Sequence, residues 1–178
     1  MESGWEREWH PGAVSQLYFT QKKLSLAERF TVFDEAENPR YYVEGSFMQI
    51  PKTFRVTDAD GHDVASITKK PLSWLPTFFV EVDGEVVATI RQEFSLLKPR
   101  YAVDGPELSV QGNLWQMRFA VLHQDVEVAR IRHEPFSWGD AYEVSVLEES
   151  LEKIVVSLVI AIDRVRATQT ADGSAASM

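Results

Sequence analysis

The chain has 178 residues, of which 44% are apolar and 11% aromatic, and it contains no cysteine. This length and apolar share are typical of one globular domain. The lack of cysteine excludes disulfide scaffolds and thiolate metal sites. With 27 acidic and 18 basic residues the net charge is −9. This balance argues against a nucleic-acid-binding protein, because such proteins present a basic face.

Both ends of the chain predict loose structure. Residues 1–16 hold Trp5 and Trp9 among charges without a usable period, and residues 167–178 are small and polar. The first residues also lack the basic-then-apolar pattern of a secretory signal. We therefore expect a flexible segment over 1–16, a folded domain over 17–166, a disordered tail over 167–178 and a cytoplasmic location.

Between the ends, short runs rich in β-branched and aromatic residues alternate with turn residues, which is the pattern of β-hairpins. The clearest turns are Asp58-Ala59-Asp60-Gly61, Asp83-Gly84, Asp104-Gly105-Pro106 and Gln124-Asp125. The first half predicts strands over 17–23, 29–34, 40–46, 53–58, 62–69 and 76–82. The second half predicts strands over 85–92, 99–104, 106–111, 116–122, 125–133 and 141–147.

The motif Val-Ala-x-Ile occurs three times, at 64–67, 87–90 and 128–131. In a regular strand its alanine and isoleucine share one face, predicted to be the inner face, and its valine takes the other. Ser73-Trp74 and Ser137-Trp138 occupy equivalent places in the two halves, which predicts that both tryptophans pack in the core or at its rim. These matches indicate that the domain consists of two repeats with six strands in each.

One helix is predicted near the C-terminus, over 150–166. Its central run, 154–162, is apolar except for Ser157, and it is shorter than the roughly 20 residues that span a membrane. A helix that is apolar on every side is buried in a core. Twelve antiparallel strands enclose a lumen that such a helix would fill. We therefore predict an all-β barrel around a central helix, with Asp163 paired with an arginine at the barrel mouth.

Three features together resemble the LURP-one-related family over residues 17–166. They are the hairpins with Val-Ala-x-Ile, the element Phe136-Ser137-Trp138-Gly139-Asp140, and the closing run Val159-Ile160-Ala161-Ile162-Asp163. This family belongs to the tubby C-terminal-like superfamily, which also includes the phospholipid scramblases. The resemblance implies a twelve-stranded barrel around a C-terminal helix. It also implies binding of phospholipid or phosphoinositide head groups, although no position here matches a lipid-binding lysine or arginine of the tubby domains.

Basic residues are the candidates for a ligand site. Lys69, Lys70, Lys98 and Arg100 each follow a Val-Ala-x-Ile strand, so we expect them to emerge at the same end of the barrel. There they would receive a phosphate group. The alternative is that these charges prevent strands from pairing between molecules.

Catalytic and metal-binding patterns are not found in the sequence. The four histidines, His10, His62, His123 and His133, lack a metal-ligand spacing, and there is no nucleophile elbow or phosphate-binding glycine loop. The sequence therefore predicts a non-catalytic binding module with no cofactor, peripheral to the membrane, whose partner is anionic phospholipid or an unknown protein. The alternatives are a structural or protein-interaction scaffold without a small ligand and, third, an enzyme of unknown type.

Overall fold

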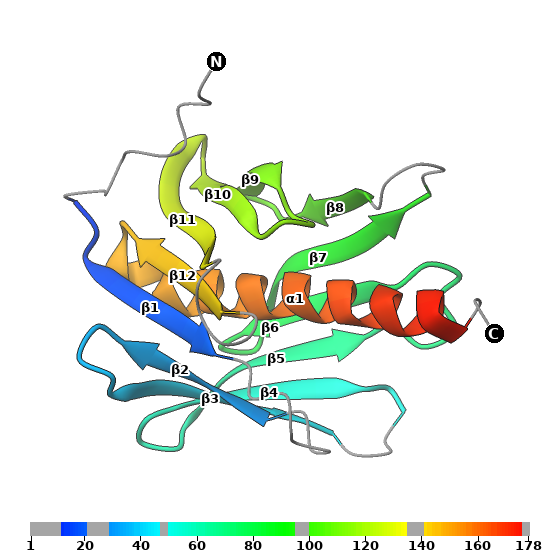
Figure 1. Cartoon of the computed structure of the whole chain (residues 1–178), viewed down its shortest axis with the longest axis horizontal. Helices are drawn as coiled ribbons and strands as arrows, with labels where there is room; N and C mark the ends of the chain where they lie inside the picture. Colours follow the sequence, from blue (N-terminus) through cyan, green and yellow to red (C-terminus); the bar gives the residue numbers. More distant parts are fainter. Residues whose placement is uncertain (1–11, 21–28, 47–49, 95–99, 135–140, 176–178) are drawn as a thin grey trace.

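The computed structural model describes residues 12–20, 29–46, 50–94, 100–134 and 141–175. Twelve strands and one long helix form a nearly closed antiparallel barrel with the helix inside it, as the sequence predicted (Figure 1). The strands are β1 (Ser15–Thr20), β2 (Arg29–Asp34), β3 (Pro39–Gly45), β4 (Thr53–Asp58), β5 (Asp63–Lys69), β6 (Thr77–Val82), β7 (Glu85–Glu93), β8 (Arg100–Asp104), β9 (Leu108–Asn113), β10 (Arg118–His123), β11 (Val126–Glu134) and β12 (Ala141–Val146).

The strands follow one another around the barrel in the order β8-β7-β6-β5-β4-β3-β2-β1-β12-β11-β10-β9. Among the described residues, β8 and β9 are the two strands that lack a second neighbour, so the seam of the barrel lies between them. The predicted hairpin at Asp104-Gly105-Pro106 is therefore wrong. Pro106 has no amide hydrogen to donate, and Gly105 packs against β7, where an added Cβ would lie 2.8 Å from the Val87 carbonyl oxygen.

Two tight turns confirm the predicted hairpins elsewhere. Asp83-Gly84 joins β6 to β7 with φ angles of 49° and 86°, and Gln124-Asp125 joins β10 to β11 with φ angles of 50° and 65°. Positive φ at both central residues is the conformation that matches the right-handed twist of two paired strands.

The valine of each Val-Ala-x-Ile motif is the extra residue of a β-bulge. Val56 on β4 pairs with Ala65, and the next residue, Thr57, pairs with Asp63. Val64 therefore has no pairing partner on β4. The same shift occurs at Val87 on β7 and at Val128 on β11. A bulge breaks the strict alternation of side chains. Our expectation that the valine faces away from the core was therefore wrong, since Val64 and Val128 are buried beside their alanines.

The helix α1 (Glu152–Ala175) follows a short 3-10 turn, η1 (Glu149–Leu151), and runs along the barrel axis (Figure 1). Its side chains from Val155 to Ile162 are at most 1% exposed, so they fill the lumen. It packs against β5, β6 and β7. The helix continues beyond the predicted end at Arg166, because the segment that follows is polar but contains no proline. Within the described residues, no helix has the length and hydropathy needed to cross a membrane.

Candidate functional site

The two ends of the barrel differ in their connections. At one end, here called the turn end, short turns join β2–β3, β4–β5, β6–β7 and β10–β11, and the chain enters α1. At the other, here called the loop end, segments of four to eight residues follow the odd-numbered strands, and α1 projects outward toward its C-terminus (Figure 1). This polarity places segments far apart in the sequence on one face of the molecule.

The turn end is acidic. Each of its six connections, flanking strand residues included, carries at least two carboxylates: Asp34, Glu35 and Glu37; Asp58, Asp60 and Asp63; Asp83 and Glu85; Asp104 and Glu107; Asp125 and Glu127; Glu148, Glu149 and Glu152. Much of the net charge of −9 therefore gathers at this end.

Some of these carboxylates build the turns themselves. Asp34 accepts hydrogen bonds from the Ala36 and Asn38 amides, both at 2.9 Å. The Asn38 amide is the main reason why the pKa of Asp34 lies below its usual value. Asp58, Asp60 and His62 also place three ligand-type atoms within 4.8 Å of one another. Both Asp58 oxygens are engaged there, by the Asp60 and His62 amides and by the His62 ring at 3.2 Å, so turn geometry accounts for the cluster.

The loop end exposes large apolar side chains. Leu72 and Trp74 lie between β5 and β6 and are essentially fully exposed, Ile50 lies between β3 and β4, and Phe94 follows β7 with 78% of its surface exposed. The prediction that Trp74 packs in the core or its rim is wrong, because it is 98% exposed. Trp138 lies outside the described residues.

Three of the four predicted ligand residues lie at this loop end. Lys69 ends β5, Lys70 follows it, and Arg100 begins β8, whereas Lys98 lies outside the described residues. The Lys69 amide donates a 2.8 Å hydrogen bond to the Lys52 carbonyl, which brings a third lysine next to the pair. Arg100 is separated from Lys69 by β6 and β7, which amounts to about 14 Å at the usual strand spacing. These residues therefore form a broad basic face and do not converge on one small ligand.

Sequence reasoning missed the apolar part of this face. The segment 71–76 begins and ends with proline and contains Leu72, Trp74 and Leu75. The two prolines were a usable signal of this exposure. Because proline interrupts the pairing of a strand, the apolar residues between Pro71 and Pro76 cannot belong to either neighbouring strand. In the described parts of the loop-end connections, 46, 50–52, 70–76, 94 and 114–117, there is no acidic residue, and the carboxylates of this end belong to the flanking strands, at Glu44, Glu93 and Glu134.

A polar cluster closes the barrel mouth at the loop end. Asp163 on α1 pairs with Arg164, as predicted, and accepts a 2.9 Å hydrogen bond from the Tyr142 hydroxyl. Burial is the main reason why the pKa of Tyr142 lies above its usual range, so the hydroxyl stays protonated and donates. The Arg164 guanidinium also lies 5.5 Å from the Phe30 ring and 5.6 Å from the Phe54 ring. These contacts are structural, because they seal the core beneath the loops.

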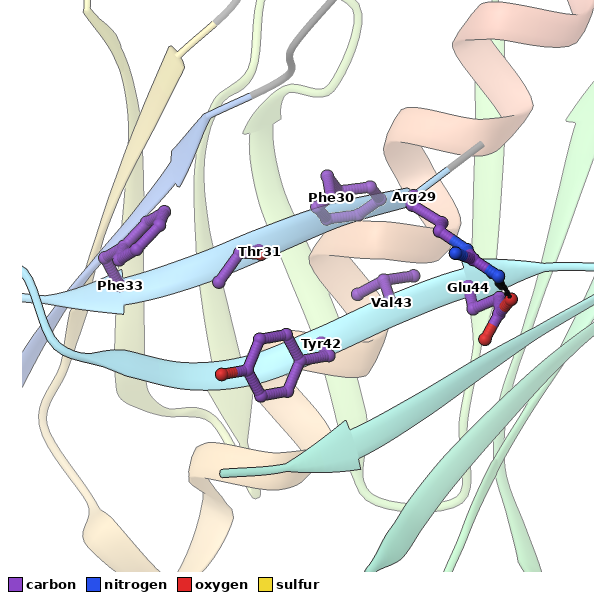
Figure 2. Close-up of a pocket in the computed structure, with 7 residues that line it drawn as sticks. All are labelled: Arg29, Phe30, Thr31, Phe33, Tyr42, Val43 and Glu44. Carbon is purple, nitrogen blue, oxygen red and sulfur yellow. Dashed lines mark hydrogen bonds and ion pairs between the residues drawn. The ribbon is translucent and has the colours of Figure 1, made fainter. Parts of the chain in front are cut away.

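A shallow pocket of about 400 Å³ lies on β2 and β3 (Figure 2). Arg29 and Glu44 pair across one side of it, and Tyr42 and Phe33 form its aromatic wall. Arg29 and Glu44 are the charged residues in the described lining, and because they neutralise each other this lining offers no net charge with which to select an ionic ligand.

Comparison with known proteins relates the chain to one family. The family described as LURP-one-related matches residues 15–163. The uncharacterized protein YxjI of Bacillus subtilis is 26% identical over 150 residues, which cover 84% of this chain and 93% of that protein. The X-ray structure of an Arabidopsis thaliana protein aligns with a TM-score of 0.52 and 12% identity, over 84% of this chain and 91% of the other. That structural likeness concerns the fold alone.

Proposed function

The chain belongs to the LURP-one-related family, and we propose that it is a non-catalytic binding module that docks on anionic phospholipid surfaces through its loop end. Lys52, Lys69, Lys70 and Arg100 contact lipid head groups, together with Lys98 from the adjoining segment. Leu72, Trp74 and Phe94 enter the interfacial region of the bilayer. The barrel stays outside the membrane.

One observation carries this proposal: the most exposed large apolar side chains, Leu72, Trp74 and Phe94 among them, lie at the same end as Lys69 and Lys70, whereas carboxylates crowd the connections of the opposite end. Exposed tryptophan and leucine beside lysine is the composition of segments that bind membrane interfaces. Each basic residue near an anionic surface contributes about 1 kcal/mol. The carboxylates of the turn end lie at the far end of the barrel, beyond a Debye length of about 8 Å at physiological salt, so their repulsion is largely screened.

Vesicle flotation tests the proposal. The protein is mixed with vesicles of phosphatidylcholine alone, with phosphatidylserine, or with a phosphoinositide. We expect flotation with both anionic compositions at low salt, and less as salt is raised. The variant with Lys69, Lys70, Lys98 and Arg100 all changed to Gln should stay at the bottom of the gradient while keeping the melting temperature of the parent.

A charge-matched pair of variants separates a local effect from one of net charge. Lys69→Gln with Lys70→Gln removes two positive charges from the loop end, and Arg55→Gln with Lys153→Gln removes two from elsewhere on the surface. Only the first pair should weaken flotation. If the parent fails to float at low salt, or both pairs behave alike, the lipid proposal is wrong and a protein-interaction scaffold is the better account of the exposed apolar loops.

A further inference from the structure

A second pocket, of about 400 Å³, lies at the loop end on the far side of the barrel from Lys69. Its residues come from the β9–β10 connection, the start of β10, the end of β11 and α1. They are Trp115, Gln116, Arg118, His133 and Arg166. Five strands separate β11 from β5, so this pocket is distinct from the basic face of Lys69 and Lys70.

The described lining of this pocket is basic, although the protein as a whole is acidic. Among the described residues that line it none is acidic, whereas two are arginines and one is a histidine. Asp163 lies 3.7 Å from the Arg166 guanidinium, but it also pairs with Arg164. Asp163 therefore pairs with two arginines, of which Arg166 lines the pocket.

The arginine on the helix is held in place before any ligand arrives. The Arg166 guanidinium lies 5.7 Å from the Trp115 ring and donates a 2.9 Å hydrogen bond to the Tyr142 hydroxyl. The His133 ring packs against the Tyr142 ring at 5.8 Å. Ordering these side chains in advance lowers the cost of binding. Trp115 is 38% exposed and offers a flat apolar wall beside the charges.

We infer that this pocket binds the phosphate group of an organic phosphate ester, with Arg118, His133 and Arg166 around the phosphate and Trp115 against the organic part. Guanidinium groups pair with phosphate through charge-assisted hydrogen bonds, and this favours a phosphate over a neutral ligand. The ester belongs either to a phospholipid head group or to a soluble molecule. The inference goes beyond membrane docking, because none of its residues belongs to the apolar or lysine face described above.

Isothermal titration calorimetry of the full chain tests this, with phenyl phosphate, inorganic phosphate and phenol as probes. We expect saturable binding of phenyl phosphate, weaker binding of inorganic phosphate and none of phenol. Arg118→Gln and His133→Asn should each weaken the affinity for phenyl phosphate about tenfold or more, which is the usual effect of losing a charged hydrogen bond. Arg55→Gln, which removes the same charge from an exposed side chain outside both proposed sites, should leave the affinity unchanged. Melting curves establish that each variant is folded.

The outcomes separate the two possible sources of the phosphate. If Arg118→Gln with His133→Asn also lowers flotation on phosphatidic acid vesicles, the pocket takes a lipid head group. If flotation is unaffected while phenyl phosphate binding is lost, it takes a soluble ester. Binding of phenyl phosphate by a protein that does not float overturns membrane docking and leaves the pocket standing. No saturable binding of phenyl phosphate, or equal binding by parent and pocket variants, overturns the inference.

Discussion

The Tyr41 hydroxyl on β3 donates a 2.7 Å hydrogen bond to Oε1 of Glu152, the first residue of the central helix. Arg40, the residue before Tyr41, donates a hydrogen bond of 2.9 Å to the same oxygen. Consecutive strand residues normally point to opposite faces. These two converge because Arg40 is the extra residue of a bulge, with Val32 paired to Tyr41 and Phe33 to Pro39. Ser15 on β1 donates to the other carboxylate oxygen at 2.6 Å, so the barrel wall fixes the entry of the helix.

Tyr41→Phe should lower the free energy of unfolding by about 1–3 kcal/mol, because it leaves a buried carboxylate oxygen with one donor fewer. Urea denaturation measures the change. Tyr42→Phe on the same strand is the matched control, since Tyr42 is 44% exposed, and it should unfold like the parent. Equal stability of the two variants would mean that Tyr41 does not hold the helix.

The same carboxylate predicts a loss of stability in acid. Burial of Glu152 opposes its ionisation, but hydrogen bonds from Ser15, Tyr41 and Arg40 outweigh this and hold its pKa below the usual value. A folded-state pKa below the unfolded value of about 4.3 gives stability that is complete above that pH and is lost as the pH falls through the folded pKa. Glu152→Gln should therefore be less stable than the parent at neutral pH. The difference should shrink below about pH 4, as followed by urea denaturation at a series of pH values.

The bulged motif predicts that substitutions at two nearby positions on β7 change the stability of the protein very differently. Ala88 is 2% exposed and β7 contacts the helix. Ala88→Leu should overpack this site at a typical cost of about 1–3 kcal/mol. Val86→Leu, two residues away and 55% exposed, should have no measurable effect. If both variants melt like the parent in a thermal scan, there is free space beside Ala88 and the inference of tight packing against the helix is wrong.

The central helix should be required for folding. Ending the chain after Glu149 removes the apolar side chains of the helix and leaves the inner face of the strands without a packing partner, so we expect insoluble or molten protein, seen as a lost near-ultraviolet circular dichroism signal. Leu158→Ala tests the same packing within a folded chain and should cost about 2–5 kcal/mol. A truncated chain that stays soluble and melts cooperatively would show that the strands can close without the helix.

The sequence predicted the strands well because hydrophobic alternation and turn residues are local signals. The observed β2 and β4 begin and end at the predicted residues, 29–34 and 53–58. The bulges escaped notice because valine and alanine are both apolar, so an extra inward residue leaves no polar mismatch in the pattern. The exposure of Trp74 was missed for a related reason. An apolar residue in a connection has the same sequence pattern whether the loop folds onto the barrel or projects from it.

Apolar contact with the bilayer predicts a component of membrane binding that salt does not remove. Leu72 and Trp74 lie beside Lys69 and Lys70 at the loop end, and the full burial of such a side chain is worth about 1.5–3 kcal/mol. Leu72→Ser with Trp74→Ser should therefore reduce flotation on phosphatidylserine vesicles at both low and high salt. The lysine variants should lose binding mainly at low salt, because screening has already weakened the charge contribution at high salt.

Val86→Ser with Val126→Ser is the control, since both valines are exposed beside turns of the acidic end. If this control lowers flotation as much as the Leu72 and Trp74 changes do, the apolar contact is not confined to the loop end and the proposed orientation of the barrel on the membrane is wrong.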